Sequence, residues 1–196
     1  MPKSRKLADP APSTRDALID AAVIVVAREG LEAASVKRIA AEAGVTPGLL
    51  HYHFPTKEAL LEAGLRRAMD AYRAVSAERR AATPPEGQVE ALFKAGRRAI
   101  DQDADVFRLR LAFAAKALSH PELAAVMRDL TTAGAEETAL SFAAARGAAA
   151  PSEDERRRGR VMKAFFDGLV LAKLLDPDFP LAEAERRLAA AFPTPP

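Results

Sequence analysis

Apolar residues along this chain recur at intervals of three and four, which predicts helices rather than strands. The first such segment follows Ser13 or Thr14, either of which can cap a helix, and it stops at Gly30. Its apolar face holds Leu18, Ala21, Ala22, Val25 and Val26. Nowhere do Val and Ile alternate with polar residues over the length of a strand, so we expect an all-α protein.

Two short helices are predicted next, joined by a tight turn. Ser35 caps the first, and Gly44 follows it at a position where a left-handed residue ends a helix. Thr46 caps the second, Pro47 takes its first position, and Phe54-Pro55 ends it. Small and apolar residues lie where the two helices would touch: Ile39, Ala40, Val45 and Leu50. This spacing predicts a helix-turn-helix.

The remaining pattern is helical to the end of the chain. A long helix runs from Thr56 to about residue 80, and a break at 81–87 precedes helices at 88–102 and 104–118. Ser119-x-x-Glu122 and Ser152-x-x-Glu155 read as capping boxes of two further helices, and a short one fills 182–192. The helix after Ser152 is expected to turn one apolar set inward: Val161, Met162, Phe165, Phe166, Leu169 and Val170. We divide the chain into a flexible arm (1–12), a helix-turn-helix domain (13–56) and a second helical domain (57–196).

Composition narrows the class of protein. The chain has 49% hydrophobic residues, enough for a core, and no cysteine, so neither a disulfide framework nor a thiolate metal site is expected. No apolar run approaches the roughly 18 residues of a membrane span, and no signal-peptide core is seen at the start, so we expect a cytoplasmic protein. The net charge of +2 is small, so any DNA binding must depend on a few placed contacts.

A helix-turn-helix places its second helix in the major groove of DNA, with that helix's first residues facing base edges. The hydroxyl and ring side chains of residues 46–53 would then meet phosphates and thymine methyl groups. Lys57 agrees with this prediction. A cation in the first turn of a helix opposes the helix dipole, and a phosphate at the same helix end would offset that cost.

Residues 13–61 resemble the tetracycline-repressor (TetR) family of bacterial transcriptional regulators. The likeness lies in an ordered set of short motifs: Ala-Ala, Gly, Ile-Ala, Ala-Gly-Val, a ring-rich helix ending in Phe, and Lys-Glu-x-Leu. It implies a homodimer that offers two helix-turn-helices to a near-palindromic double-stranded DNA operator. It also implies that the C-terminal helices dimerise and enclose a pocket for a small-molecule effector. The effector would move the long helix and relieve repression, with no cofactor and no catalysis.

The resemblance also assigns roles to residues. Lys37 is placed to reach a base, and the groove-facing start of the recognition helix is Thr46, Pro47, Gly48 and Leu49. Phosphates would be held by Ser35, His51, Tyr52, His53 and Lys57. Two positions depart from the family pattern. Most members carry Ser, Thr or Ala where Leu49 stands and Tyr where His51 stands, which alters the expected operator sequence.

The C-terminal half offers candidates for the pocket and for the dimer interface. The pocket candidates are Phe93, Phe107, Phe113, Met127, Phe142, Met162 and Phe165, each of which also fits a plain core position. We expect the dimer seam along 155–175 with the 122–146 helix, and assign Phe166, Gly168 and Leu169 to it. A glycine inside a helix costs about 1 kcal/mol relative to Ala, which close approach to a symmetry-related helix at Gly168 would offset. Arg108, Arg110 and His120 fit either an acidic effector or a solvated surface.

Several other interpretations stay open at this point. His51 and His53 point to different helix faces, so the pair is poorly placed to chelate a metal. His53 also fits a wedge between helices, Lys37 and Lys57 fit solvated charges, and the cluster Lys3, Arg5 and Lys6 fits either a minor-groove arm or a solubilising tail. The sequence contains none of the common catalytic motifs that would indicate an enzyme. A helical interaction module that no longer reads DNA is the remaining alternative to a ligand-responsive regulator.

Overall fold

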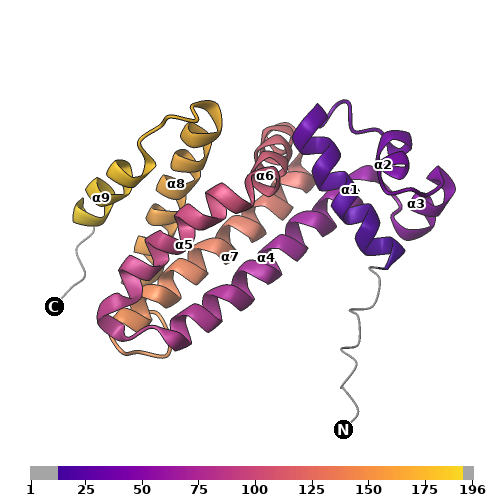
Figure 1. Cartoon of the computed structure of the whole chain (residues 1–196). Helices are drawn as coiled ribbons and strands as arrows, with labels where there is room; N and C mark the ends of the chain where they lie inside the picture. Colours follow the sequence, from indigo (N-terminus) through magenta and orange to yellow (C-terminus); the bar gives the residue numbers. More distant parts are fainter. Residues whose placement is uncertain (1–12, 192–196) are drawn as a thin grey trace, which may run out of the picture.

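In the computed structural model, which describes residues 13–191 and the side chains of 13–188, the chain folds into nine α-helices and one short 3₁₀ turn. The helix-turn-helix lies at one end of the molecule, and a long helix leads from it to the opposite end (Figure 1). The elements are α1 (Thr14–Glu29), α2 (Val36–Glu42), α3 (Pro47–His53), α4 (Lys57–Ala82), η1 (Pro85–Gly87), α5 (Gln88–Gln102), α6 (Ala104–Ala117), α7 (Pro121–Ala145), α8 (Glu153–Leu175) and α9 (Leu181–Ala191). The all-α fold is confirmed.

Side-chain caps begin five of these helices, as their sequences indicate. The hydroxyls of Ser13, Ser35, Thr46, Thr56 and Ser152 each accept a hydrogen bond from a backbone N–H in the first turn. The predicted capping box of Ser152 and Glu155 is present in both directions. These caps satisfy N–H groups that have no partner inside the helix, which fixes where each helix starts.

The other predicted capping box, at Ser119 and Glu122, is wrong. The α7 helix starts at Pro121, with His120 in the cap position and no side-chain cap. The backbone N–H of Ser119 instead bonds to the carbonyl of Lys116 and completes the last turn of α6. Proline favours the first position of a helix, so Pro121 sets the start one residue later than the box would.

The larger apolar core joins the helix-turn-helix to the helices behind it. Leu18, Ile39, Leu50 and Leu60 are fully buried together with Leu109 of α6. Gly64 of α4 packs against side chains of α1 and against Leu109. The limits 13–56 and 57–196 stay a prediction, and the apolar core is continuous across them.

A second, smaller apolar cluster lies among α5, α6, α8 and α9. It is built on Ile100, Val170 and Leu181, with Phe107, Phe166 and Leu169 packed against it. The α7 and α8 helices approach so closely that a Cβ added at Gly159 would lie 2.5 Å from the carbonyl oxygen of Ala135. Close approach therefore occurs at Gly159. Nothing lies within 4 Å of such a Cβ at Gly168 within the protomer, so the predicted close approach of a partner subunit's helix there stays a prediction.

Two kinds of feature are absent from the described residues. No helix within 13–191 is both long and apolar enough to span a membrane. In the same part of the chain, no group of three or more His, Cys, Asp or Glu side chains is arranged to hold a metal ion. The predicted arm at residues 1–12 lies outside the described residues.

Candidate nucleic-acid interface and charged interior

The turn between α2 and α3 has the geometry that the sequence predicts. Gly44 adopts a left-handed φ of +69°, and the N–H of Val45 bonds to the carbonyl of Ala40 at 2.9 Å. Ile39, Ala40 and Leu50 are completely buried where the two helices meet. The helix-turn-helix is therefore held by one small contact zone.

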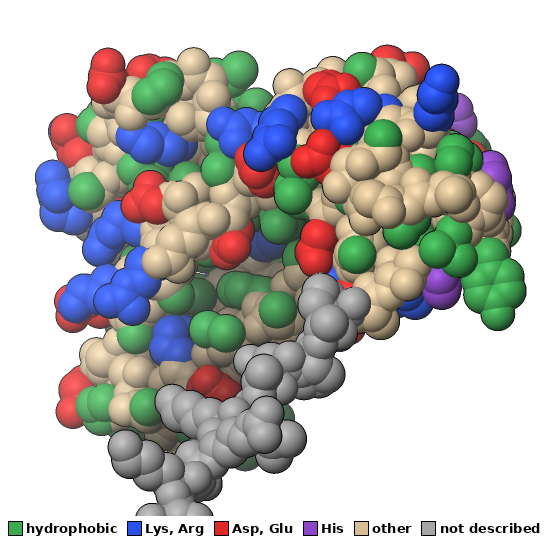
Figure 2. Space-filling model, turned by 45° about the vertical axis from the view of Figure 1, so that its right-hand side comes forward, with side chains coloured by type: hydrophobic (Ala, Val, Ile, Leu, Met, Phe, Trp, Pro, Cys, Tyr) green, Lys and Arg blue, Asp and Glu red, His purple; other side chains and the backbone are tan. Residues whose placement is uncertain are grey.

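Leu50 is the only buried residue of α3, and the rest of the helix turns toward solvent. Tyr52 is 82% exposed and Leu49 is 37% exposed. The exposed members of the predicted reading surface are Thr46, Pro47, Gly48, Leu49, His51 and Tyr52, whereas His53 is half-buried. Figure 2 shows imidazoles and apolar side chains gathered at the right-hand end of the molecule. This helix carries hydroxyl, ring and methyl groups outward and no carboxylate.

The two neighbouring cations of α2 differ in their surroundings. Arg38 is held by Glu29 and Glu42, with N···O distances of 2.7 and 2.9 Å. Lys37 is exposed, and among the described residues no acidic side chain forms an ion pair with it. Ser35 accepts the N–H of Arg38 at 3.2 Å, which leaves its own hydroxyl proton free to donate. Lys37 and Ser35 are thus available to an external anion, and Arg38 is not.

Lys57 has a structural partner that the sequence did not reveal. Its Nζ donates to the carbonyl oxygen of Leu31 at 3.0 Å, which ties the start of α4 to the loop after α1. The side chain is half-buried. An ammonium group has three protons to donate, so this bond leaves two for another acceptor.

The aromatic candidates of the C-terminal half are distributed unevenly. Phe113, Phe142 and Met162 are buried, and Phe93, Phe107 and Met127 are half-buried. The placement of the adjacent pair Phe165 and Phe166 is the reverse of the one predicted. Phe165 is 49% exposed, whereas Phe166 packs inward on Phe107 with ring centroids 6.0 Å apart.

The direction of α8 explains this reversal. Met162 and Val170 are buried and Phe166 lies midway between them at four-residue spacing, so these three share the inner face. Val161 comes one residue before Met162, and Phe165 comes one residue before Phe166. Both therefore fall on the outer face, where Val161 is 46% exposed. Gly168 lies on the outer face, whereas Leu169 and Phe166 belong to the inner cluster. The prediction that Val161 and Phe165 face inward is therefore wrong, and Phe166, which was predicted both on the inner face and at the dimer seam, lies on the inner face.

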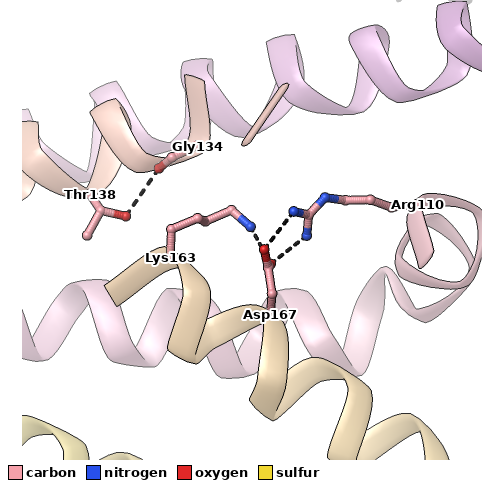
Figure 3. Close-up of polar contacts among 5 residues, drawn as sticks. All are labelled: Arg110, Gly134, Thr138, Lys163 and Asp167. Carbon is pink, nitrogen blue, oxygen red and sulfur yellow. Dashed lines mark hydrogen bonds and ion pairs between the residues drawn. The ribbon is translucent and has the colours of Figure 1, made fainter. Parts of the chain in front are cut away.

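A cluster of charged side chains lies between α6, α7 and α8 (Figure 3). Both oxygens of Asp167 accept hydrogen bonds from Arg110, at 2.5 and 2.7 Å, and Lys163 also donates to Asp167. Arg110, one of the cations considered for an acidic effector, is thus already paired. Burial and the nearby Arg110 charge lower the pKa of Lys163 to about 8, and Asp167 only partly offsets them.

A second polar cluster lies where α4 crosses α7. Arg80 and Glu137 form an ion pair at 2.7 Å, and the side chains of both are largely buried. Arg79 donates to the hydroxyl of Ser141 at 2.8 Å. Neither of these two polar clusters was predicted from the sequence. Only the four-residue spacing of Lys163 and Asp167 was readable, because the other partners are more than fifty residues apart in the chain.

Comparison with known proteins agrees with this geometry. Residues 18–63 match bacterial regulatory proteins of the tetR family, and residues 85–193 match the C-terminal part of BetI-type transcriptional repressors. The HTH-type transcriptional regulator BetI of Rhizobium meliloti is 34% identical over 166 residues, which cover 84% of this chain and 79% of that protein.

Solved structures of similar proteins cover nearly the whole chain. A transcriptional regulator from Rhodococcus sp. RHA1 is 28% identical with a TM-score of 0.72, and the match covers 90% of this chain and 92% of that one. The multidrug binding protein EbrR, complexed with malachite green, is 29% identical with a TM-score of 0.69, covering 93% of this chain and 99% of that one.

Proposed function

Because the chain belongs to the TetR family of bacterial transcriptional regulators, with a C-terminal part of the BetI repressor type, we propose that it is a homodimeric repressor. In this proposal, a small molecule releases it from its operator. The relatives it matches are transcriptional regulators rather than enzymes. A regulator of this kind acts on the bacterial chromosome, so we place it in the cytoplasm.

One observation supports the DNA-binding role most directly. The α3 helix is anchored by Leu50 alone and exposes almost all its other side chains, including the large ring of Tyr52. A seven-residue helix is too short to be stable without contacts. The major groove supplies those contacts when the helix lies in it.

The residue roles follow from this arrangement. Lys37, free of an acidic partner, reaches a guanine acceptor, while Thr46, Pro47, Gly48 and Leu49 face base edges. Leu49 meets a thymine methyl, because it has no group that bonds a base. The phosphate contacts come from Ser35, His51, Tyr52, His53 and the two unused protons of Lys57.

The outer face of α8 is the surface we assign to the partner subunit. Its exposed apolar and small residues recur at three- and four-residue spacing: Val161, Ala164, Phe165, Gly168, Leu171 and Leu175. The first three line a surface hollow of about 450 Å³ together with Arg160. An apolar stripe of this length on one helix is typical of a protein interface. This replaces the Phe166 and Leu169 contacts that we predicted from the sequence and keeps Gly168.

The effector pocket lies, in this proposal, among the helices of the C-terminal half, and EbrR supports it. EbrR, which shares the fold over nearly its whole length, is a multidrug binding protein complexed with malachite green. The aromatic candidates that remain on the inner side are Phe93, Phe107, Phe113, Met127, Phe142 and Met162.

The test is a selection from a random DNA duplex library at about 100 mM salt, because specific contacts must compete there with nonspecific charge attraction. We expect an enriched near-palindrome whose half-sites lie one or two helical turns apart. Lys37→Ala should cost about 1–3 kcal/mol on that sequence and relax the preference at one base pair.

A scrambled duplex serves as the control for this selection. Equal losses on matched and scrambled DNA would show that Lys37 does not read a base. If no sequence is enriched for the wild type, with or without candidate ligands, the helix-turn-helix is an interaction module instead.

A further inference from the structure

Part of the interior of the C-terminal half is polar. Gly134, Glu137, Thr138 and Ser141 are all buried on α7 and follow one another at three- and four-residue spacing, so they share one helix face. They follow Leu130, which belongs to the cluster around Leu109, toward the C-terminal end of the helix. We call these four residues the polar stripe.

The side chains that meet the polar stripe carry more positive than negative charge. Arg79 and Arg80 reach it from α4, and Lys163 lies against it from α8, since a Cβ at Gly134 would be 2.8 Å from Cε of Lys163. Arg110 is connected to Lys163 through Asp167, which accepts hydrogen bonds from both. Glu137 is bonded to Arg80. Four cations thus share two carboxylates, and Arg79 is the one whose hydrogen-bond partner is a neutral hydroxyl.

Arg79 has unused hydrogen-bonding capacity. Its Nη2 donates to Ser141, but its Nε and Nη1 are shielded from solvent and have no hydrogen-bond partner in the described residues. A buried donor without an acceptor is costly, and a charged donor more so. Burial accordingly lowers the pKa of Arg79, although a guanidinium keeps its charge at any physiological pH. The group best suited to these donors is an anion with several oxygen acceptors.

Resting on the proposed function, we propose that the effector carries a carboxylate and binds along the polar stripe, with the carboxylate on Arg79 and with Lys163 adding the second positive charge. Gly134 and Ser141 are seven residues apart, about 10 Å along the helix axis, which is the length of a small organic acid. Tyr72 and Ser76 lie on the same face of α4 as Arg79, and Ser76 is buried. They would offer hydroxyl groups to the rest of the ligand.

This site is well placed for regulation because Arg79 belongs to α4. The same helix begins at Lys57, which is bonded to the loop after α1 at the helix-turn-helix. A ligand that pulls on Arg79 therefore acts directly on the element that joins the two halves. The α4 interface with α7 is polar at this point, so a shift of α4 there does not break an apolar core.

The experiment uses benzoate and hexanoate as probes, each against its uncharged amide, at constant ionic strength. The readouts are the Tm of the protein and the release of a labelled operator duplex taken from the selection above. We expect both acids to raise Tm and release the duplex more strongly than their amides do. Arg79→Met should weaken the response to acids about tenfold or more, and Lys163→Met should weaken it less.

Arg73→Met is the matched control, because Arg73 lies on the same helix with its side chain 49% exposed. It should leave the acid response unchanged. Amides or the cationic dye malachite green acting as strongly as the acids would overturn the proposal, and so would an acid response that survives Arg79→Met. The Tm readout needs no DNA, so failure of operator binding alone would count against the proposed function and not against the anion site.

Discussion

Glu155, in the first turn of α8, connects this helix to Arg146 at the end of α7. Its carboxylate accepts two hydrogen bonds from Arg146, at 3.1 and 3.0 Å, and one from the backbone N–H of Ser152 at 2.6 Å. The Arg146 hydrogen bonds lower the pKa of Glu155 to about 2, against the opposing effect of burial, with help from Ser152. The loop between α7 and α8 is closed by this one group.

We predict that Glu155→Gln removes an acid-sensitive part of the stability. The folded pKa is depressed below its usual 4.5, so the stabilisation is complete above pH 4.5 and is lost as pH falls toward 2. It should amount to about 1–2 kcal/mol at pH 7, reduced from the full pKa shift because Arg146 is half exposed to solvent. Urea unfolding at pH 7 and pH 3 measures it. Glu153→Gln, exposed in the same turn, is the control, and an equal pH dependence in wild type and Glu155→Gln would disprove the role.

Residue-scale features differ in how far the sequence predicts them. The left-handed Gly44 and the caps at Ser35 and Thr46 were predictable because the interacting atoms lie within a few residues of one another. The pairing of Arg110 with Asp167 was not, because 57 residues separate them and only the tertiary fold brings them together. Predicting which of Phe165 and Phe166 turns inward needed the register of α8 against its neighbours.

At the scale of elements, α7 and α8 depend on a contact between backbones. Gly159 of α8 is buried against the carbonyl of Ala135 and the Cβ of Ala139. Two helices can come this close only where one of them has no side chain. The sequence gives no local sign of it, because Gly159 stands between two arginines in a run that reads as a solvated surface.

We predict that Gly159→Ala destabilises the protein by about 1–3 kcal/mol, although alanine favours helices. The added methyl would lie 2.5 Å from a backbone oxygen, so the two helices must move apart. Chemical unfolding gives the change in free energy. Gly48→Ala is the matched control, since nothing lies within 4 Å of its Cβ, and it should leave stability unchanged or slightly raised. Equal effects of the two substitutions would mean that the helices do not touch at Gly159.

At the scale of the whole molecule, the helix-turn-helix is part of one continuous core rather than an attached module. Leu109 and Phe113 of α6 are buried in the same cluster as Leu18 and Leu50. Lys116 of α6 also bonds to Glu58 in the first turn of α4 at 2.6 Å. Packed interiors transmit displacement because they cannot be compressed. We therefore expect a rearrangement of α4 or α6 in the C-terminal half to change the position of α3 and, in a dimer, the distance between the two reading helices.

The distance between the two reading helices depends on which surface forms the dimer interface. We assign that interface to the outer face of α8, and Gly168→Leu tests the assignment. Within one protomer nothing lies within 4 Å of a Cβ at Gly168, so a leucine there fits without strain and can disturb only a partner. We expect the variant to keep its helical content and to sediment as a monomer. Its affinity for the full palindrome should fall to about that for a single half-site, because binding of one subunit no longer assists the other. Arg98→Leu, which adds the same side chain on an exposed position of α5, should stay dimeric. A dimer that persists in Gly168→Leu would place the seam on another face of the C-terminal helices, and the apolar stripe of α8 would then need a different partner.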